Sequence, residues 1–108
     1  MIKRSKVKFI SEKLEKEFEF LPEEDFIKKS IRRAIEDLKQ NAFCGIQIPK
    51  RIFPPEYIKK YCITNLWKYD LPNGWRLIYT IVSENEIKII SAILEWFNHK
   101  DYERMFHY

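Results

Sequence analysis

One stretch of the chain, NLWKYDLPNGWRLIYTIV at residues 65–82, constrains the fold more than any other. On both sides of the central Pro72-Asn73-Gly74 segment, side chains of different character alternate with a period of two. Aromatic and aliphatic residues dominate both halves, which is typical of strands. The Asn-Gly pair between them supplies the positive φ angles of a tight turn. The stretch is therefore expected to form a β-hairpin.

Three charged side chains stand within this apolar ribbon. In a hairpin in which Leu71 opposes Trp75, Asp70 faces Arg76 across the two strands. Lys68 then lies diagonally beside Arg76 on the same face. A cation among core-like residues costs free energy unless its face is open to solvent or to an anionic ligand. We therefore expect a sheet with one packed face and one concave, open face that carries Lys68 and Arg76.

The remaining sequence predicts elements in the order β-α-α-β-β-β-α. The second helix has one apolar stripe, because apolar residues recur in it at three- and four-residue steps. This stripe is expected to meet the packed face of the hairpin; it consists of Ile27, Ile31, Ile35 and Leu38, and its expected partners are Trp75, Leu77, Tyr79 or Ile81. The expected elements are a strand at 7–10, a helix at 12–20, a helix opened by the acidic residues 23–25 and ended by residues 41–45, a short helix at 56–60, the hairpin, a central strand at 87–94 and a final helix at 100–106.

These elements predict a single α+β domain over residues 1–108, since a chain of this length forms one core and not two. We expect a mostly antiparallel sheet of about four strands, two N-terminal helices on one of its faces and a short C-terminal helix. The fractions of hydrophobic residues, 45%, and of aromatic residues, 16%, exclude a disordered chain.

Several classes of site and location are not expected. No apolar run approaches the roughly 20 residues that span a bilayer, and no apolar segment of a signal peptide follows Met1, so a cytoplasmic protein is expected. Cys44 and Cys62, with His99 and His107, show no recognised zinc spacing, so neither a metal site nor a cofactor is expected. A disulfide between the two cysteines is not expected in a cytosolic domain with a good core.

The net charge of +4 is unevenly distributed, and one strongly basic segment spans residues 47–68. Its cations are Lys50, Arg51, Lys59, Lys60 and Lys68, and they are interleaved with Phe53, Tyr57, Tyr61 and Trp67. Cations that bind phosphates and aromatic rings that stack on bases are the two components of a single-stranded nucleic acid site. A solvated charged loop over the edge of a core has the same composition, and both interpretations stay open.

Three segments resemble RelE/ParE-superfamily toxins of type II toxin-antitoxin systems. GWRLIYTI at 74–81 is similar to that family's Gly-aromatic-Arg-Leu-aliphatic-Tyr strand, and NLWKYDL at 65–71 is similar to the strand before it. HKDYERMF at 99–106 resembles the family's closing pattern of a histidine or basic residue followed by an aromatic residue. The resemblance implies a RelE/ParE-like fold and a cognate antitoxin protein as a partner.

The ribonuclease members of this family bind in the ribosomal A site and cut mRNA without a metal ion. By this resemblance, the catalytic residues would be Arg76, at the position of the family's strand arginine near the scissile phosphate, with Lys68 and His99. Asp70 departs from the pattern, because well-known members carry a second lysine there. The resemblance adds Lys100 and, as a base-stacking aromatic, Tyr102 or Phe106 to the candidate substrate-binding residues. The others come from the basic segment and are Lys50, Arg51, Lys59 and Lys60.

In that chemistry the ribose 2′-hydroxyl attacks the phosphodiester. Arg76 would neutralise the phosphorane, because a guanidinium is always charged and binds phosphate through two hydrogen bonds. His99 would transfer protons, since an unperturbed histidine has a pKa near 6.5. Each residue also has a structural interpretation: Arg76 as a cross-strand partner of Asp70, Lys68 as a partner of Asp70 or a surface lysine, and His99 as a capping or surface residue at the start of the last helix.

Three functions remain open on the sequence alone. The leading one is a ribosome-dependent mRNA endonuclease that inhibits translation. The first alternative is a ParE-like toxin that poisons DNA gyrase, and the presence of Asp70 in place of a lysine favours it. The second is a non-catalytic RNA-binding or inactivated toxin that only pairs with an antitoxin. The sequence also leaves open any RNA sequence preference and which of His99, Tyr102, Phe106 and His107 takes part in catalysis.

Overall fold

The structure, a computed structural model, describes residues 2–85 and 87–106. These residues form an α+β fold with four α-helices, three short 3-10 helices and five strands. In chain order the elements are β1 (Lys6–Phe9), α1 (Glu12–Phe20), α2 (Phe26–Gln40), a 3-10 turn (Ala42–Cys44), β2 (Ile46–Gln47), a second 3-10 turn (Lys50–Ile52), α3 (Pro55–Tyr61), β3 (Trp67–Asp70), a third 3-10 turn (Pro72–Gly74), β4 (Arg76–Ser83), β5 (Ile89–Phe97) and α4 (His99–Phe106).

The five strands of the described chain form one mixed sheet in the order β1-β5-β4-β3-β2. β1 runs parallel to β5, whereas the other neighbouring strands are antiparallel. The α+β class and a central position for β5 are therefore confirmed, but the sheet has one strand more than expected and its orientation is mixed. β2 escaped the sequence pattern because two residues are too few to show an alternation.

The hairpin of β3 and β4 has the register that the sequence predicted. The amide of Leu71 donates to the carbonyl oxygen of Trp75 at 2.8 Å, and Asp70 stands opposite Arg76. Asn73 and Gly74 in the turn have φ angles of 60° and 78°. Both residues tolerate this left-handed conformation, glycine because it has no Cβ and asparagine because its short polar side chain bonds locally.

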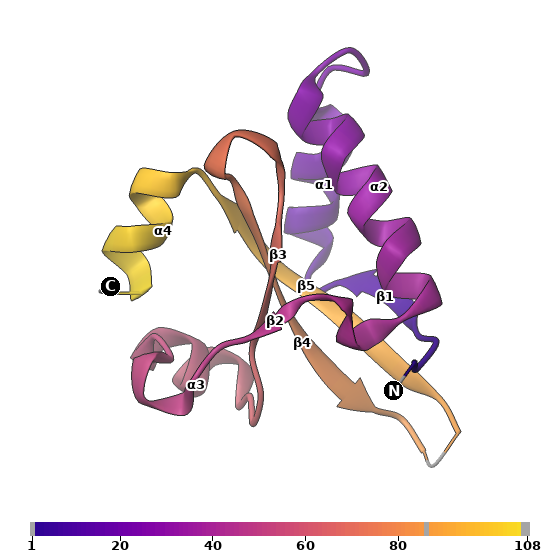
Figure 1. The fold of residues 1–108 in the computed structure, drawn as a ribbon, viewed down its shortest axis with the longest axis vertical. Helices are drawn as coiled ribbons and strands as arrows, with labels where there is room; N and C mark the ends of the chain where they lie inside the picture. Colours follow the sequence, from indigo (N-terminus) through magenta and orange to yellow (C-terminus); the bar gives the residue numbers. More distant parts are fainter. Residues whose placement is uncertain (1, 86, 107–108) are drawn as a thin grey trace.

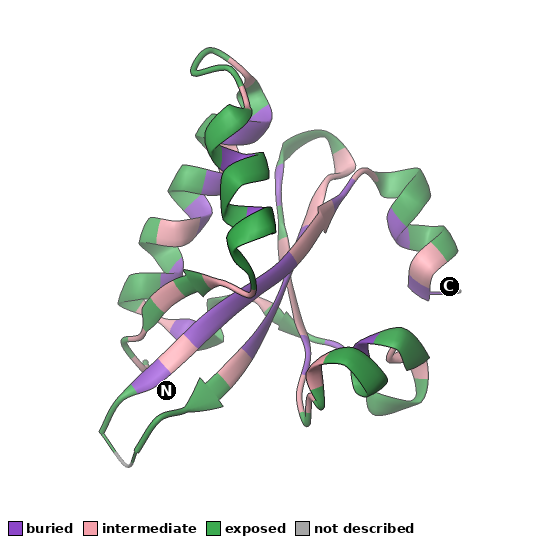
Figure 2. Cartoon of the chain, turned by 180° about the vertical axis from the view of Figure 1, so that it is seen from behind, coloured by how far each residue is buried: buried purple, intermediate pink, exposed green. Residues whose placement is uncertain are grey.

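The first face of the sheet is covered by α1 and α2 (Figure 1). Ser11 caps α1 by accepting a hydrogen bond from the amide of Leu14 at 3.2 Å, and Asp25 caps α2 through the amide of Ile27 at 2.7 Å. The apolar stripe of α2 meets the hairpin as expected; this core contains Ile27, Ile31, Leu38, Leu77 and Tyr79, with Ile35, Trp67, Trp75 and Ile81 packed against it. Figure 2 shows buried residues running through the middle of the sheet.

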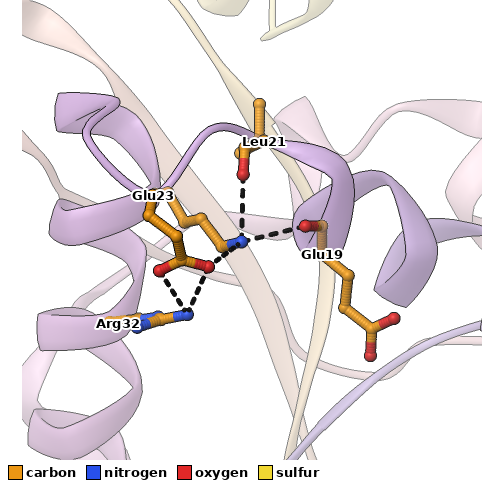
Figure 3. A network of polar contacts seen from close by, with 5 residues as sticks. Glu19, Leu21, Glu23 and Arg32 are labelled. Carbon is orange, nitrogen blue, oxygen red and sulfur yellow. Dashed lines mark hydrogen bonds and ion pairs between the residues drawn. The ribbon is translucent and has the colours of Figure 1, made fainter.

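A lysine is buried where α1 turns into α2. Lys28 is 3% exposed, and its ammonium donates to the carbonyl oxygens of Glu19 and Leu21, both at 2.9 Å, and to the carboxylate of Glu23 at 2.8 Å. Figure 3 shows Glu19, Leu21, Glu23 and Arg32 gathered around this network. The hydrogen bond from Lys28 lowers the pKa of the Glu23 carboxyl. Lys28 therefore satisfies carbonyl groups at the end of α1 that the helix itself leaves unpaired.

The second face of the sheet is not open, which corrects the expectation from the sequence. α3 and α4 lie on this side (Figure 1) and enclose a second apolar core. Its buried members are Ile48, Tyr57, Leu66, Ile78, Leu94, Phe97, Tyr102 and Phe106. The prediction failed because the last helix carries Tyr102 and Phe106 four residues apart, which gives it an apolar stripe that packs on the sheet.

Candidate functional site

The candidate site is the cluster of Lys68, Asp70 and Arg76 on the second face of the sheet. Cross-strand pairing brings Asp70 and Arg76 together, and the carboxylate oxygen Oδ1 lies 2.9 Å from the Arg76 Nε and 3.7 Å from the Lys68 Nζ. The side chains of Lys68 and Arg76 are each 18% exposed, whereas that of Asp70 is 50% exposed. Two largely buried cations thus share one carboxylate.

Tyr102 of α4 lies against both cations. The ring centre is 5.6 Å from the Lys68 Nζ and 5.5 Å from the guanidinium carbon of Arg76. A tyrosine ring at this distance attracts a cation through its negative face, and the attraction grows when water is excluded. The ring therefore helps to hold both cations at the sheet, and it covers part of the surface that a ligand would approach.

The guanidinium of Arg76 does not use its full hydrogen-bonding capacity. Its Nη1 donates to the carbonyl oxygen of Trp75 at 3.2 Å. Its Nε is close enough to Asp70 for an ion pair, but within the described residues this buried atom makes no hydrogen bond of acceptable geometry. We take the contact as an ion pair whose N–H does not point at the oxygen. That buried Nε is closed to a ligand, but Nη2 makes no hydrogen bond within the described residues, and a phosphate oxygen could accept from it.

His99 lies beside the turn of the hairpin, and its role in proton transfer stays a prediction. A Cβ added to Gly74 would lie 3.1 Å from the Cβ of His99, so the first residue of α4 packs against the turn that precedes Arg76. The side chain is 60% exposed, and its Nε2 contacts the carboxylate of Glu103 one helical turn later. His99 is therefore near the cluster in the fold, but its imidazole is turned along α4.

The two aromatic candidates for base stacking do not present free faces. Tyr102 is 2% exposed and Phe106 is fully buried. Their ring centres are 4.7 Å apart, and Phe106 also meets the edges of Tyr57 and Phe97. In this conformation both rings pack in the second core, and their assignment to base stacking stays a prediction. Lys100 is exposed on the same helix, and His107 lies outside the described residues.

The basic segment divides into a cationic surface and a buried aromatic side. Lys50, Arg51, Lys59 and Lys60 are exposed around the second 3-10 turn and α3, where a polyanion could reach them. Tyr57 is 4% exposed, and Phe53 and Tyr61 pack against the second core. The interleaved aromatic residues therefore serve packing, because the short helix α3 uses them to attach itself to the sheet.

Glu95 is a polar residue of the second face that the sequence analysis missed. The register between β4 and β5 shifts between Ile78 and Tyr79, so Leu94 is an extra residue that turns Glu95 toward α3. Its carboxylate accepts a hydrogen bond from the Tyr57 hydroxyl at 2.8 Å, and burial raises its pKa. The sequence could have indicated Glu95, because it is the one acidic residue in the otherwise mostly apolar strand IISAILEWF.

The described residues contain no cluster of His, Cys, Asp and Glu side chains that could hold a metal ion, and none of their helices is long and apolar enough to cross a membrane. Cys44 and Cys62 are free and exposed. Comparison with known proteins found no matching family model, no similar curated protein and no similar solved structure.

Proposed function

We propose that this chain is a RelE/ParE-like toxin that cuts mRNA on the ribosome without a metal ion and is held inactive by a cognate antitoxin. The observation that carries the proposal is the cluster of Lys68 and Arg76, two cations on one sheet face that share a single carboxylate. The resemblance of the strands at 65–71 and 74–81 to toxin strands supplies the reaction class. The order of one strand, two helices and an antiparallel hairpin is compatible with that fold.

Arg76 would stabilise the transition state of the cleavage. When the 2′-hydroxyl attacks, negative charge grows on the two non-bridging phosphate oxygens, and a guanidinium with unused donors can bind both. The ring of Tyr102 lies against the guanidinium and would hold it in place before the substrate arrives, so little reorganisation would be required at the moment of reaction. Lys68 would add a second positive charge beside the same phosphate.

Proton transfer would fall to His99 in this proposal. Its imidazole is exposed at the end of the sheet where the hairpin turn meets α4, so a rotation of its side chain away from Glu103 would free it for the substrate. The exposed cations of the second 3-10 turn and of α3 would bind the RNA backbone on the same side of the sheet. Cytoplasmic location and ribosome binding belong to the same proposal.

A second candidate, a ParE-like gyrase poison, is favoured by one specific observation. Asp70 already neutralises one of the two cations, and the aromatic residues of α4 are packed in the core. Such an arrangement suits a protein that uses this fold to bind a partner and does not bind a scissile phosphate at Arg76. An inactivated toxin that only pairs with its antitoxin would have the same features.

The decisive experiment is an in vitro translation reaction with mapping of mRNA ends, run beside a gyrase cleavage assay. We expect the unsubstituted chain to cut mRNA only when ribosomes are present. Arg76→Ala should lower the cleavage rate by roughly a hundredfold, since loss of one such group costs on the order of 3 kcal/mol in the transition state. Arg76→Lys should recover little, because the planar fork is lost.

The matched control is Arg33→Ala, which removes an exposed arginine from α2. It should cleave mRNA at the unsubstituted rate, and both alanine variants should pellet with ribosomes. Gyrase-dependent DNA breaks without mRNA cleavage would establish the ParE-like alternative. Two outcomes would leave Arg76 as a structural partner of Asp70 and end the ribonuclease proposal. One is that Arg76→Ala and Arg33→Ala cleave mRNA at the same rate; the other is that Arg76→Ala unfolds while His99→Ala cleaves at the unsubstituted rate.

A further inference from the structure

A second cationic region lies at the opposite edge of the sheet, along β1. A groove with a volume of about 560 Å³ runs between the N-terminal half of β1, the end of α2 and the start of β5. Five cations line it, namely Arg4, Lys6, Lys8, Lys39 and Lys88, and no acidic residue lines it within the described part of the chain. These cations come from three separate segments of the sequence, which meet only in the folded chain.

Most of these cations are not paired. Lys39 contacts Glu36 on its own helix at 3.0 Å, but Arg4, Lys6, Lys8 and Lys88 make no ion pair among the residues that the structure describes. Gathering like charges without counter-charges costs free energy in the absence of a ligand. Such a concentration of positive charge attracts a polyanion and raises its local concentration at the protein surface.

The segment that carries Arg4, Lys6 and Lys8 is held against the body of the protein. The amide and hydroxyl of Ser5 donate to the carbonyl oxygens of Lys39 and Leu38 at 3.1 and 2.8 Å, and the amide of Ala42 donates to the carbonyl oxygen of Lys3 at 2.6 Å. β1 also pairs with β5 along Lys6–Phe9. The cations are therefore pre-organised, unlike those of a loose basic tail, and binding does not have to order the backbone that carries them.

Lysines on an edge strand have a second explanation, since they prevent edge-to-edge pairing with other sheets. Lys6 and Lys8 serve this purpose, because they alternate along β1 with Val7 and Phe9, which pack on the first core. That explanation does not account for Lys39 on α2 and Lys88 before β5, which line the same groove. It also disfavours a peptide strand added to β1 as the occupant. The convergence of three segments favours a phosphate backbone.

We propose that this groove binds the phosphate backbone of a structured RNA. The groove is separate from the candidate cleavage site. Ile90, the β5 partner of Lys6, stands beside Val82, and Val82 lies six positions along β4 from Arg76, a span of roughly 20 Å. A ligand that occupied both places at once would therefore have to be a polymer. The inference goes beyond the proposed function, because RNA binding here does not require that the chain cleaves anything.

Fluorescence anisotropy with a labelled 20-base-pair RNA duplex, titrated at several KCl concentrations, tests the proposal. We compare Lys6→Gln/Lys8→Gln with the charge-matched control Lys13→Gln/Lys16→Gln, which removes two exposed lysines from α1. The groove variant should bind about tenfold or more weakly at 100 mM KCl, and the slope of log K against log salt should fall by about 1.5. The control should keep the unsubstituted affinity and slope.

Lys88→Gln, which lies outside β1, is the second test and should also weaken duplex binding. Equal losses in the groove and control variants would overturn the proposal, because they would report net charge alone. Unchanged duplex affinity in Lys6→Gln/Lys8→Gln, together with self-association on size-exclusion chromatography, would show that the lysines only protect the edge. Binding of a glutamate-rich peptide in place of RNA would also overturn it. Failure of mRNA cleavage in the translation assay would leave the duplex result standing.

Discussion

Two largely buried cations on opposite faces of the sheet have very different surroundings. Lys28, between α1 and α2, uses all three ammonium donors on two backbone carbonyls and one carboxylate (Figure 3). Arg76, on the second face, shares Asp70 with Lys68 and leaves its buried Nε without a well-directed hydrogen bond. The first arrangement is saturated, whereas in the second the guanidinium makes one hydrogen bond, from Nη1, and its Nη2 makes none within the described residues.

This difference separates structural from functional interpretations of a buried cation. A saturated cation contributes to stability, because its removal leaves polar groups unpaired in the protein. An unsaturated one contributes less to stability and is available to stabilise charge that appears only during a reaction. Substitution of Lys28 should therefore lower mainly the stability of the protein, whereas substitution of Arg76 should lower mainly its activity.

The largest effect on stability is expected at Lys28. Lys28→Met fills a similar volume but leaves the carbonyl groups of Glu19 and Leu21 without their donor, which should lower the free energy of unfolding by about 3 kcal/mol. The melting temperature should fall by about 12 °C. Lys29→Met, next to it but 62% exposed, is the matched control and should change the free energy by less than about 0.5 kcal/mol. Equal losses of stability in Lys28→Met and Lys29→Met would show that the three hydrogen bonds of the buried lysine do not stabilise the protein more than an exposed lysine does.

A smaller effect on stability is expected at Asp70. Asp70→Asn removes the charge that Lys68 and Arg76 share but keeps the side-chain volume, and because the carboxylate is half exposed we expect a loss of about 0.5 kcal/mol in urea unfolding. The two cations would then be free to meet a phosphate, so mRNA cleavage should persist or rise. Loss of cleavage in a folded Asp70→Asn protein would mean that the carboxylate is needed to orient Arg76.

The smallest effects concern two carboxyl groups whose pKa values move in opposite directions. Burial raises the pKa of Glu95 above its ordinary value near 4.5. The contribution of this group to the free energy of unfolding is therefore fully present below pH 4.5, and it is lost as the pH rises through the raised pKa of the folded protein. Glu95→Gln should therefore be more stable than the unsubstituted chain at pH 8, and the two should converge as the pH falls toward 4. Thermal melts across this range measure the difference.

Glu23 provides the internal comparison for that experiment. Its pKa is lowered by the hydrogen bond from Lys28, so its contribution to stability is present above the ordinary pKa and is lost as the pH falls through the lowered one. Glu23→Gln should thus be the less stable protein at pH 8, opposite in sign to Glu95→Gln. A shared sign for both variants would contradict the assignment of Glu95 to a desolvated position.

Local patterns in the sequence determined the hairpin and the helices. Asn73 and Gly74 tolerate positive φ angles, and the period-two alternation on either side of them fixes the register, which places Asp70 opposite Arg76. The caps at Ser11 and Asp25 and the stripe of α2 are likewise properties of neighbouring residues. Such features depend on contacts only a few residues apart, so they can be predicted without the fold.

Only the tertiary structure decided what covers the cations and what surrounds them. An apolar stripe such as that of Tyr102 and Phe106 has the same sequence whether it packs in a core or stacks on a base, and here the sheet face buries it. The parallel pairing of β1 with β5, the position of Glu95 and the groove of five cations join residues from distant parts of the chain. Contacts of that kind depend on how whole elements pack, and local periodicity carries no information about them.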